Sequence, residues 1–370
     1  MTVLLISVLG MGALWVLALL YAVRQFAARG RSGVGPPPAP LPRVSILIAA
    51  RNEEHTLPRC LASIRALRYP PHLLEVLVGN DASTDRTAAV AAAAMQGFAG
   101  QFAVVDITQT LGLARGKANV LAHLARRATT DFFFITDADI SLPHSWIGAM
   151  LAQANPGVGT VTGITAVRGP RVLDQLQGLD WLFSLALLQV VSDTGRPVTA
   201  MGNNMLISRT AYEATGGYEA LPFSVTEDYA LFQNVVQRGF NFRQVFQAAV
   251  RADSLPMPTW GGLLRQRRRW LRGVEALPRR LRLELLAFGS IWLVLALLGG
   301  LAGPWALLAG WTVKLLTQSL LMQGAYRRAG LRLPWHLLPL FEVYTLALTL
   351  TLPIYRLLHP RVEWKGREYE

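Results

Sequence analysis

Hydrophobic positions divide this chain into three regions, beginning with an almost wholly apolar run over residues 2–23. A run of this length can cross the hydrocarbon core of a bilayer. Cationic residues follow the run, at Arg24, Arg29 and Arg31, and it is too long for the core of a cleaved signal peptide. We therefore expect an uncleaved anchor over 1–24 with Arg24 in the cytoplasm, followed by a proline-rich linker over 25–42.

The middle region, residues 43–258, alternates short apolar runs with helical patterns. The runs that we expect to form buried strands are VSILIAA, LEVLVGN, FAVVDI, FFFITDAD and VGTVTGITAV. Helical patterns such as TLPRCLASIRAL and GKANVLAHLARRA lie between them. This alternation predicts an α/β fold with a mostly parallel sheet, in which ligands bind at the carboxyl ends of the strands.

The last region is again apolar, but it begins with arginines. Residues 259–283 predict a basic amphipathic helix in the membrane interface, because five apolar side chains fall on one helical face: Leu263, Trp270, Leu271, Val274 and Leu277. The run over 285–322 is too long for one crossing and is broken by GGLAGP, so it predicts a helical hairpin. One more crossing over 334–358 and a basic tail over 359–370 complete the chain.

Composition agrees with a membrane protein. Of 370 residues, 52% are hydrophobic and 16% charged, which excludes a disordered chain. Residues 265–282 hold eight arginines and one acid, Glu275, and so +7 of the net charge of +13. This segment runs into an apolar one, which favours anionic phospholipid over nucleic acid as its partner. The single Cys60 excludes an intramolecular disulfide and cysteine-rich metal sites.

Two charged residues lie inside the predicted crossings. Lys314 precedes the basic pair at 327–328 by 13 positions, and Glu342 follows it by 14, so antiparallel helices would bring both to a similar depth. They either pair with each other, or Lys314 reaches lipid phosphate while Glu342 faces the protein. Four crossings would also place the basic tail outside, against the positive-inside rule, unless one segment lies in the interface.

Acidic residues follow the predicted strands. FFFITDADI delivers Asp137 and Asp139 to a strand end, where two carboxylates suit Mg²⁺ or Mn²⁺ together with substrate phosphates. In VGNDASTDRT, we expect a helix to start near Ser83 or Thr84. The segment is either an N-cap with Asp85 in the first turn, or the place where Asp81 hydrogen-bonds a nucleotide base, and the two are compatible for different residues. Arg51 and Glu53 follow another strand and enter the same crevice, or form a surface ion pair.

Three further segments have both a structural and a chemical interpretation. In GKANVL, Lys117 at a helix start is placed to meet phosphate, although the P-loop spacing is absent. In TEDYAL, Glu227 and Asp228 begin a helix, whose dipole alone would favour acids there. Gln266, Arg269 and Trp270 in RQRRRW belong to the basic interfacial helix whatever else they do.

Taken in order, these strings resemble the membrane-bound family 2 glycosyltransferases, which have a GT-A fold. The resemblance covers about 220 residues, from VSILIAARNEE through NDASTDRT, GKANVL, TDAD and TED to the Q-x-x-R-W of QRRRW. It implies that Asp81 recognises the nucleotide base, with Arg51, Glu53 and Lys117 in the same donor site. It also implies that Asp139 and Asp137 hold the metal and the diphosphate, and that Asp228 is the catalytic base. The residues that would close the site beside the acceptor are Glu227, Gln266, Arg269 and Trp270. NDAS departs from the family's commoner D-D-x-S, so Asn80 stands where its first carboxylate would be.

The function expected from this resemblance is inverting, metal-dependent transfer of one sugar from a nucleotide-sugar, a UDP-sugar in our hypothesis, to a lipid hydroxyl. The metal would be Mg²⁺ or Mn²⁺. The enzyme would be a multi-pass protein of the inner membrane with a cytoplasmic catalytic domain, and we expect no nucleic acid among its partners. Two alternatives stay open. One is a small processive polysaccharide synthase, since Q-x-x-R-W is typical of those enzymes as well. The other is a non-catalytic nucleotide-binding scaffold, which would have no need for the complete acidic set.

Overall fold

The computed structural model describes residues 1–29, 35–198, 200–275, 277–359, 361–364 and 367–369, so Arg31 and Lys365 lie outside the described residues. The chain folds into two compact units. The first unit comprises Met1–Ser32, Pro170–Val190 and Met257–Glu370, and the second comprises Gly33–Gly169 and Val191–Pro256. The predicted catalytic region over 43–258 is thus interrupted by a segment that packs with the apolar helices.

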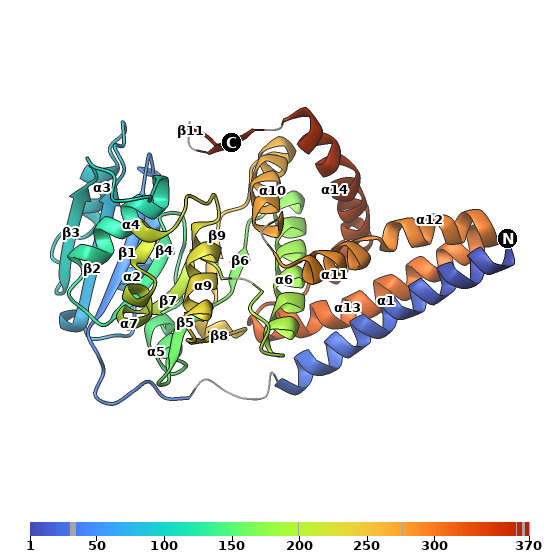
Figure 1. Ribbon diagram of the computed structural model, residues 1–370, viewed down its shortest axis with the longest axis horizontal. Helices are drawn as coiled ribbons and strands as arrows, with labels where there is room; N and C mark the ends of the chain where they lie inside the picture. Colours follow the sequence, from blue (N-terminus) through green and yellow to red (C-terminus); the bar gives the residue numbers. More distant parts are fainter. Residues whose placement is uncertain (30–34, 199, 276, 360, 365–366, 370) are drawn as a thin grey trace. The chain divides into compact units, whose positions relative to one another are not determined.

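A seven-stranded sheet forms the centre of the second unit, in the order β3-β2-β1-β4-β7-β5-β8 (Figure 1). Its strands are β1 (Val44–Ala50), β2 (Leu74–Asn80), β3 (Gln101–Asp106), β4 (Phe132–Asp137), β5 (Val158–Thr162), β7 (Asn204–Ser208) and β8 (Asn241–Gln244). Strands β1 to β4 are mutually parallel, whereas β7 runs antiparallel to both β4 and β5. The predicted mostly parallel sheet is therefore confirmed.

One predicted strand is wrong in its extent, and three strands of this unit were not predicted, namely β7, β8 and a short one at Ala252–Ser254. VGTVTGITAV is two strands, β5 and β6 (Thr165–Val167), and β6 pairs with β9 (Ala252–Ser254) in a separate sheet. The strand is interrupted at Gly163. A Cβ atom added to this residue would lie 2.6 Å from the Asn204 side chain, so the close approach of the two segments requires glycine. Strand β7, which contains Asn204, follows a polar loop and was not predicted.

Helices cover the sheet, and the two whose patterns were predicted lie where expected. They are α2 (Leu57–Arg65) and α4 (Gly116–Arg127). The other helices of the second unit are α3 (Thr87–Ala94), α5 (Trp146–Leu151), α7 (Arg209–Ala214), α8 (Gly217–Ala220) and α9 (Glu227–Gln237). Cys60 on α2 is a free, buried thiol, and burial together with the nearby Asp139 and Asp137 raises its pKa. It is a core residue, as its isolation in the sequence suggested.

The first unit is helical apart from the short strands β10 (Val362–Trp364) and β11 (Arg367–Tyr369). Its helices are α1 (Thr2–Arg29), α6 (Val172–Ser192), α10 (Trp260–Glu275), α11 (Arg279–Gly289), α12 (Ile291–Ala302), α13 (Pro304–Arg328) and α14 (Leu338–Leu358). Helix α1 continues past the expected boundary at Arg24, because Phe26 is buried and Arg328 lies 4.2 Å from its ring. Helices α12 and α13 form the predicted hairpin and pack with α1 (Figure 1).

The single interfacial helix expected over 259–283 is wrong, since it is two helices. Helix α10 ends at Glu275 and α11 begins after Pro278. Proline has no N–H to donate and disfavours helical backbone in the residue before it, here Leu277, so a continuous helix is disfavoured at this point. The arginines of 265–272 and those of 279–282 therefore belong to separate helices.

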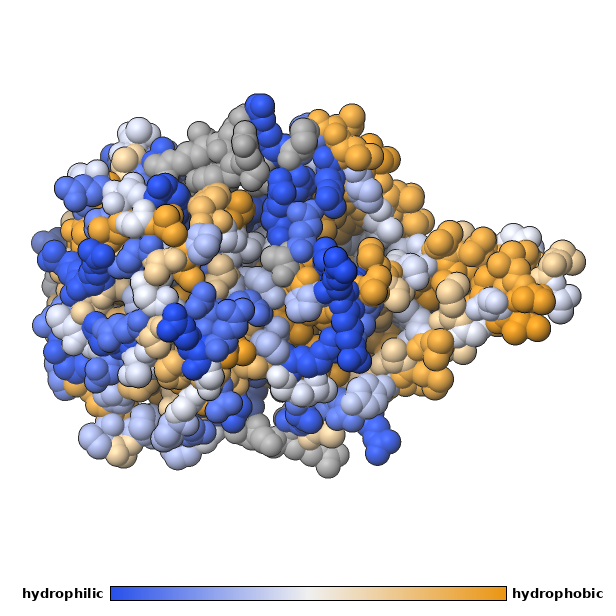
Figure 2. All heavy atoms as spheres, in the orientation of Figure 1, coloured by the Kyte–Doolittle hydropathy of each residue, from blue (hydrophilic) through white to orange (hydrophobic). Residues whose placement is uncertain are grey.

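Two helical segments are long and apolar enough to cross a membrane by length and composition, namely Thr2–Arg29 and Trp335–Leu358. The pair α11 and α12, bent by 41°, would add a third if it formed one span. Helix α13 does not meet the criterion among the described residues, because its polar side chains, such as Lys314 and Gln318, lower its mean hydropathy. Figure 2 shows apolar residues gathered where α1 and α12 lie, many of them exposed, as a lipid-facing surface requires.

Candidate active site

The register of the parallel strands brings the predicted strand-end residues to one edge of the sheet. Ala50, the last residue of β1, pairs with Asn80 at the end of β2, and Asn80 pairs with Asp106 at the end of β3. On the other side of β1, Ala49 pairs with Asp137 at the end of β4. Residues from four strands thus meet at the carboxyl edge, where α/β sheets bind ligands.

Arg51 and Asp81 lie together at this edge. The Arg51 Nη1 atom donates to the Asp81 carbonyl oxygen at 2.8 Å and lies 3.8 Å from the Asp81 carboxylate. The Asp81 N–H donates to the carbonyl of Ala50 at 2.9 Å, which extends the β1–β2 pairing by one residue. Two residues predicted for the donor site are therefore neighbours, with the Asp81 side chain partly accessible.

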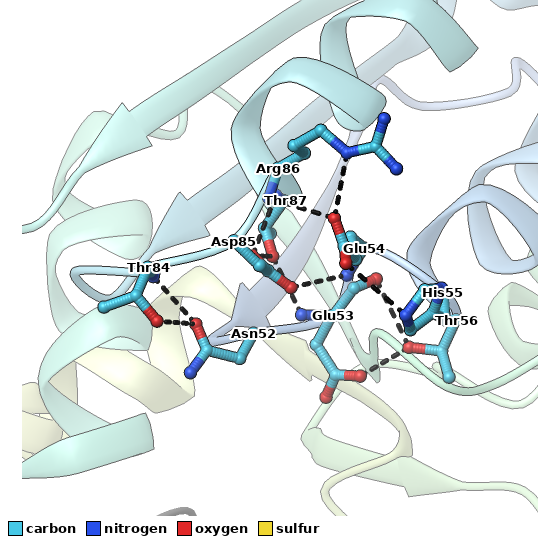
Figure 3. A network of polar contacts seen from close by, with 9 residues as sticks. All are labelled: Asn52, Glu53, Glu54, His55, Thr56, Thr84, Asp85, Arg86 and Thr87. Carbon is cyan, nitrogen blue, oxygen red and sulfur yellow. Dashed lines mark hydrogen bonds and ion pairs between the residues drawn. The ribbon is translucent and has the colours of Figure 1, made fainter.

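Polar contacts join the loops that follow β1 and β2 (Figure 3). Asn52 Oδ1 accepts from the Thr84 N–H at 2.8 Å, and the Glu53 N–H donates to Thr87 Oγ1 at 2.8 Å. The Glu53 carboxylate itself accepts from the Thr56 hydroxyl at the start of α2. Asp85 Oδ1 accepts from the Thr87 N–H at 2.9 Å. Helix α3 begins at Thr87, so the helix start expected near Ser83 or Thr84 is wrong and Asp85 lies before the first turn. These hydrogen bonds connect the two loops that flank Asp81.

Asn80, which replaces the family's usual carboxylate, holds the edge together. Its Nδ2 donates to Asp106 Oδ1 at 2.8 Å, and its Oδ1 accepts from the Ser83 N–H at 3.2 Å. An aspartate here would have no donor to offer Asp106 and would repel it. The departure from the family pattern is thus matched by Asp106 on the neighbouring strand.

A charged cluster around Lys117 connects β4, α4 and α9. The Lys117 ammonium lies 2.7 Å from Asp137 Oδ1 and 3.1 Å from Glu227 Oε1. Burial lowers the pKa of Lys117, but the charges of Asp137, Glu227 and Asp228 outweigh it and the pKa lies above its ordinary value. Burial likewise raises the pKa of Glu227, while Lys117 lowers it in part. Lys117, expected only to meet phosphate, here organises the acidic residues.

Asp228 is held by backbone donors in a fixed orientation. Its Oδ2 accepts from the Gly202 N–H at 2.7 Å, and its Oδ1 accepts from the Tyr229 N–H at 2.8 Å. A Cβ on Gly202 would lie 2.8 Å from the Asp228 Cβ, so only glycine allows this approach. Gly202 was missed in the sequence, because a glycine in a loop gives no sign of which side chain it contacts.

Asp137 and Asp139 provide the oxygen donors that a divalent cation would use. The described residues contain no group of three His, Cys, Asp or Glu side chains placed to hold a metal ion. Two carboxylates suffice when substrate phosphates and water complete the coordination, which is the usual arrangement for Mg²⁺. Arg59 donates to the Asp139 carbonyl at 3.0 Å and so positions the turn that carries this residue. The donor set fits the expected metal.

Gln266, Arg269 and Trp270 lie on α10, in the first unit. Among their neighbours there, Arg267 forms an ion pair with Asp180 of α6, and its guanidinium lies 4.4 Å from the Trp270 ring. Arg268 is 4% exposed. These two arginines point toward neighbouring helices, because α6 contributes Asp180 and α14 contacts α10 as well.

Comparison with known proteins identifies the family. The profile of glycosyl transferase family 21 matches residues 10–370, nearly the whole chain. The chain belongs to glycosyl transferase family 21. The expected resemblance to membrane-bound glycosyltransferases is thereby confirmed, and the profile that matches is that of family 21 where family 2 was expected.

Curated relatives match the catalytic region. A probable glycosyltransferase of Bacillus subtilis, YdaM, is 29% identical over 244 residues, which cover 63% of this chain and 55% of the relative. The poly-beta-1,6-N-acetyl-D-glucosamine synthase of Staphylococcus aureus (strain COL) is 26% identical over 234 residues, covering 62% and 54%. The family 21 chain thus spans about half the length of the curated relatives it matches.

A solved structure supports the fold. The mannosyltransferase PcManGT of Pyrobaculum calidifontis, in complex with GDP-Man and Mn²⁺, has a TM-score of 0.59 and 21% identity, covering 94% of this chain and 97% of its own. The predicted GT-A fold with terminal apolar helices is therefore confirmed for this glycosyltransferase.

Proposed function

We propose that this glycosyltransferase transfers one sugar, with inversion, from a nucleotide-diphospho-sugar to a lipid hydroxyl at the cytoplasmic face of the membrane. The observation that carries the proposal is the cluster in which Lys117 holds Asp137 and Glu227 beside Asp228 at the carboxyl edge of the sheet. It supplies both groups that the reaction needs, a phosphate-binding strand end and a carboxylate base.

The residues of this chain divide the work by position. Asp81 and Arg51 hold the nucleotide at the ends of β1 and β2, where nucleotides bind in open α/β sheets. Asp228 accepts the proton of the acceptor hydroxyl as that oxygen attacks the anomeric carbon. The N–H groups of Gly202 and Tyr229 donate to the Asp228 carboxylate and hold it in one orientation during the transfer.

Asp139 and Asp137 would hold a divalent cation, which neutralises charge on the departing nucleoside diphosphate when bound. The Mn²⁺ in the PcManGT complex supports this proposal. Lys117 forms an ion pair with Asp137 at the same strand end and so orients this carboxylate for the cation.

A lipid acceptor is favoured by the first unit. Its two or three candidate spans are few for an enclosed polymer channel. Its arginines suit an anionic membrane surface, because positive charge exceeds negative charge there: Arg268, Arg272 and Arg356 lie near one carboxylate, that of Glu275. For Gln266, Arg269 and Trp270 the role beside the acceptor stays a prediction from the resemblance.

The second candidate is processive polysaccharide synthesis, which the similarity to poly-beta-1,6-N-acetyl-D-glucosamine synthase favours. Product length separates the two. Full-length enzyme in vesicles of bacterial phospholipid is supplied with labelled UDP-glucose, UDP-N-acetylglucosamine or GDP-mannose and Mn²⁺. One label on an extractable lipid supports the proposal, whereas a polymer would establish the alternative. Label found only as free sugar would contradict both acceptors.

A further inference from the structure

Tyr218 carries a buried hydroxyl without a partner. The residue is 2% exposed, and among the residues that the structure describes none hydrogen-bonds its hydroxyl. Buried polar groups in proteins are almost always paired, so an unpaired one calls for a partner outside the protein or a catalytic role. The residue lies on α8, directly after Gly216 and Gly217, whose φ angles of 79° and 70° are left-handed. The turn that positions the Tyr218 side chain therefore requires glycine.

A small pocket adjoins this side chain. It is lined by α4 and by the segment from α8 to α9, including Arg115, Ala118, Tyr218, Phe223 and Glu227. All of these residues belong to the second unit. Tyr218 and Glu227 therefore border the same space, and Lys117 follows Gly116 at the start of α4 beside them.

Glu227 connects the pocket to the candidate active site, because it forms an ion pair with Lys117, which also pairs with Asp137. Burial raises the pKa of Tyr218, and the charges of Glu227, Tyr212, Asp228 and Asp137 raise it further. Asp137 belongs to the proposed diphosphate site, and Asp228 is the proposed base. The anomeric carbon must lie between a leaving diphosphate and a base, which places the sugar ring next to Tyr218.

We propose that the Tyr218 hydroxyl hydrogen-bonds a hydroxyl of the transferred sugar, as a donor-specificity contact inside the pocket beside Glu227. This inference rests on the proposed function. A neutral hydroxyl suits this position, because it can donate to or accept from a sugar hydroxyl without adding charge to the acidic cluster. A site that hydrogen-bonds a substrate hydroxyl discriminates strongly against analogues that lack it.

Tyr212 offers a matched comparison. Its hydroxyl accepts from the Tyr218 N–H at 3.2 Å and lies 3.3 Å from Glu219 Oε2, so it is a structural hydroxyl with protein partners. Removing a paired buried hydroxyl destabilises a protein, whereas removing an unpaired one is neutral or stabilising. The two tyrosines should therefore respond oppositely to loss of the hydroxyl.

The experiment compares Tyr218→Phe, Tyr212→Phe and wild-type full-length enzyme in detergent. The donor is whichever of UDP-glucose, UDP-N-acetylglucosamine and GDP-mannose the wild type turns over, tested with its deoxy analogues and with UDP or GDP alone. Tyr218→Phe should lower kcat/KM by about 5–100-fold, leave nucleoside diphosphate binding unchanged, and not lower the unfolding temperature. One deoxy donor should be as poor for wild type as for Tyr218→Phe, with no further loss in the variant.

Other results would overturn the inference. Unchanged kcat/KM in Tyr218→Phe, with an active wild type, would remove Tyr218 from the site while leaving the proposed function intact. A lower unfolding temperature, or equal loss of nucleoside diphosphate binding, would show a structural hydroxyl instead. A wild type that turns over none of the donors would overturn the proposed function, and this inference with it.

Discussion

Two buried lysines, one in each unit, have opposite surroundings. Lys117 in the second unit forms ion pairs with Asp137 and Glu227, and the charge of Asp228 raises its pKa as well. Lys314 in the first unit forms an ion pair with one carboxylate, that of Glu342, at 2.5 Å. Gln318 completes the second cluster, because its Oε1 accepts from Lys314 at 3.2 Å and its Nε2 donates to the other oxygen of Glu342 at 2.9 Å. The expected pairing of Lys314 with Glu342 is therefore confirmed.

The difference lies in charge balance. In the Lys314 cluster one cation meets one anion, the amide joins them, and all three residues are at most 3% exposed. A balanced, fully hydrogen-bonded cluster needs no ligand and joins α13 to α14. In the Lys117 cluster negative charge exceeds positive, which a folded protein tolerates where a cation or a proton donor is to bind. From this difference we expect the Lys117 cluster to take part in the reaction and the Lys314 cluster to stabilise the fold.

The largest effect is expected from Asp228→Asn in the unbalanced cluster. Loss of the base should lower transfer by about 10²–10⁴-fold, while nucleotide-sugar binding persists, because Asp228 acts on the acceptor proton. Rates and donor affinity are measured on the same preparation. Asp131→Asn, an exposed aspartate of the same unit, serves as control. Wild-type turnover in the Asp228 variant would refute the assignment.

Breaking the balanced cluster should affect stability. Lys314→Met or Glu342→Gln leaves one buried charge unpaired, and such changes cost about 3–5 kcal/mol in other proteins. The double variant should lose less than the sum of the two, by about 0.5–3 kcal/mol, because the two side chains contact each other. Unfolding is followed in detergent. Additive losses would mean that the pair contributes nothing as a pair.

Asp139→Ala tests the metal side of the unbalanced cluster. Removal of an outer-shell partner of a metal ligand weakens metal binding by about 10–100-fold, and loss of a ligand itself should weaken metal-dependent donor binding by at least as much. Calorimetry with Mn²⁺ and UDP measures it. Asp106→Ala, at the same sheet edge but bonded to Asn80, should keep that dependence. Unchanged Mn²⁺-dependent binding in the Asp139 variant would place the metal elsewhere.

The smallest effect concerns a second unbalanced group, the arginines of α10 and α11. Burial, with Arg272 and Arg356 nearby, lowers the pKa of Arg268, so this region favours an anion. Changing the exposed Arg265, Arg279 and Arg280 to glutamate should reduce the preference for anionic over neutral vesicles, by about 1 kcal/mol per residue and less at high salt. The control changes three exposed arginines of the second unit: Arg127, Arg238 and Arg243. Equal rates of wild type in both lipids would contradict lipid docking.

Much of the fold and part of the site could be predicted from sequence. The runs VSILIAA and LEVLVGN predicted β1 and β2 to the residue, because buried parallel strands need continuous apolar side chains. The same argument placed Asp81, Asp137 and Asp139 at strand ends on one edge. The depth of Lys314 and Glu342 followed from helix geometry alone.

Other features depend on contacts between distant segments. The Pro170–Val190 segment packs with the apolar helices although it lies inside the catalytic region of the sequence, and its Asp180 is what draws Arg267 inward. The local sequence does not predict such a partner, because the pattern of an amphipathic helix places arginine on the exposed face whether or not another helix packs there.

The sequence by itself determined the kinds of elements, the sheet edge where ligands bind, and the membrane character of the two ends, since each follows from local periodicity and hydrophobic length. Only the tertiary structure decided that Lys117 joins Asp137 to Glu227, that Gly202 orients Asp228, and that Tyr218 stands unpaired beside them. The physical reason is range. Hydrophobic periodicity is encoded by neighbours in the chain, whereas hydrogen bonds and buried charges join residues that only packing of the whole unit brings within about 3 Å of one another.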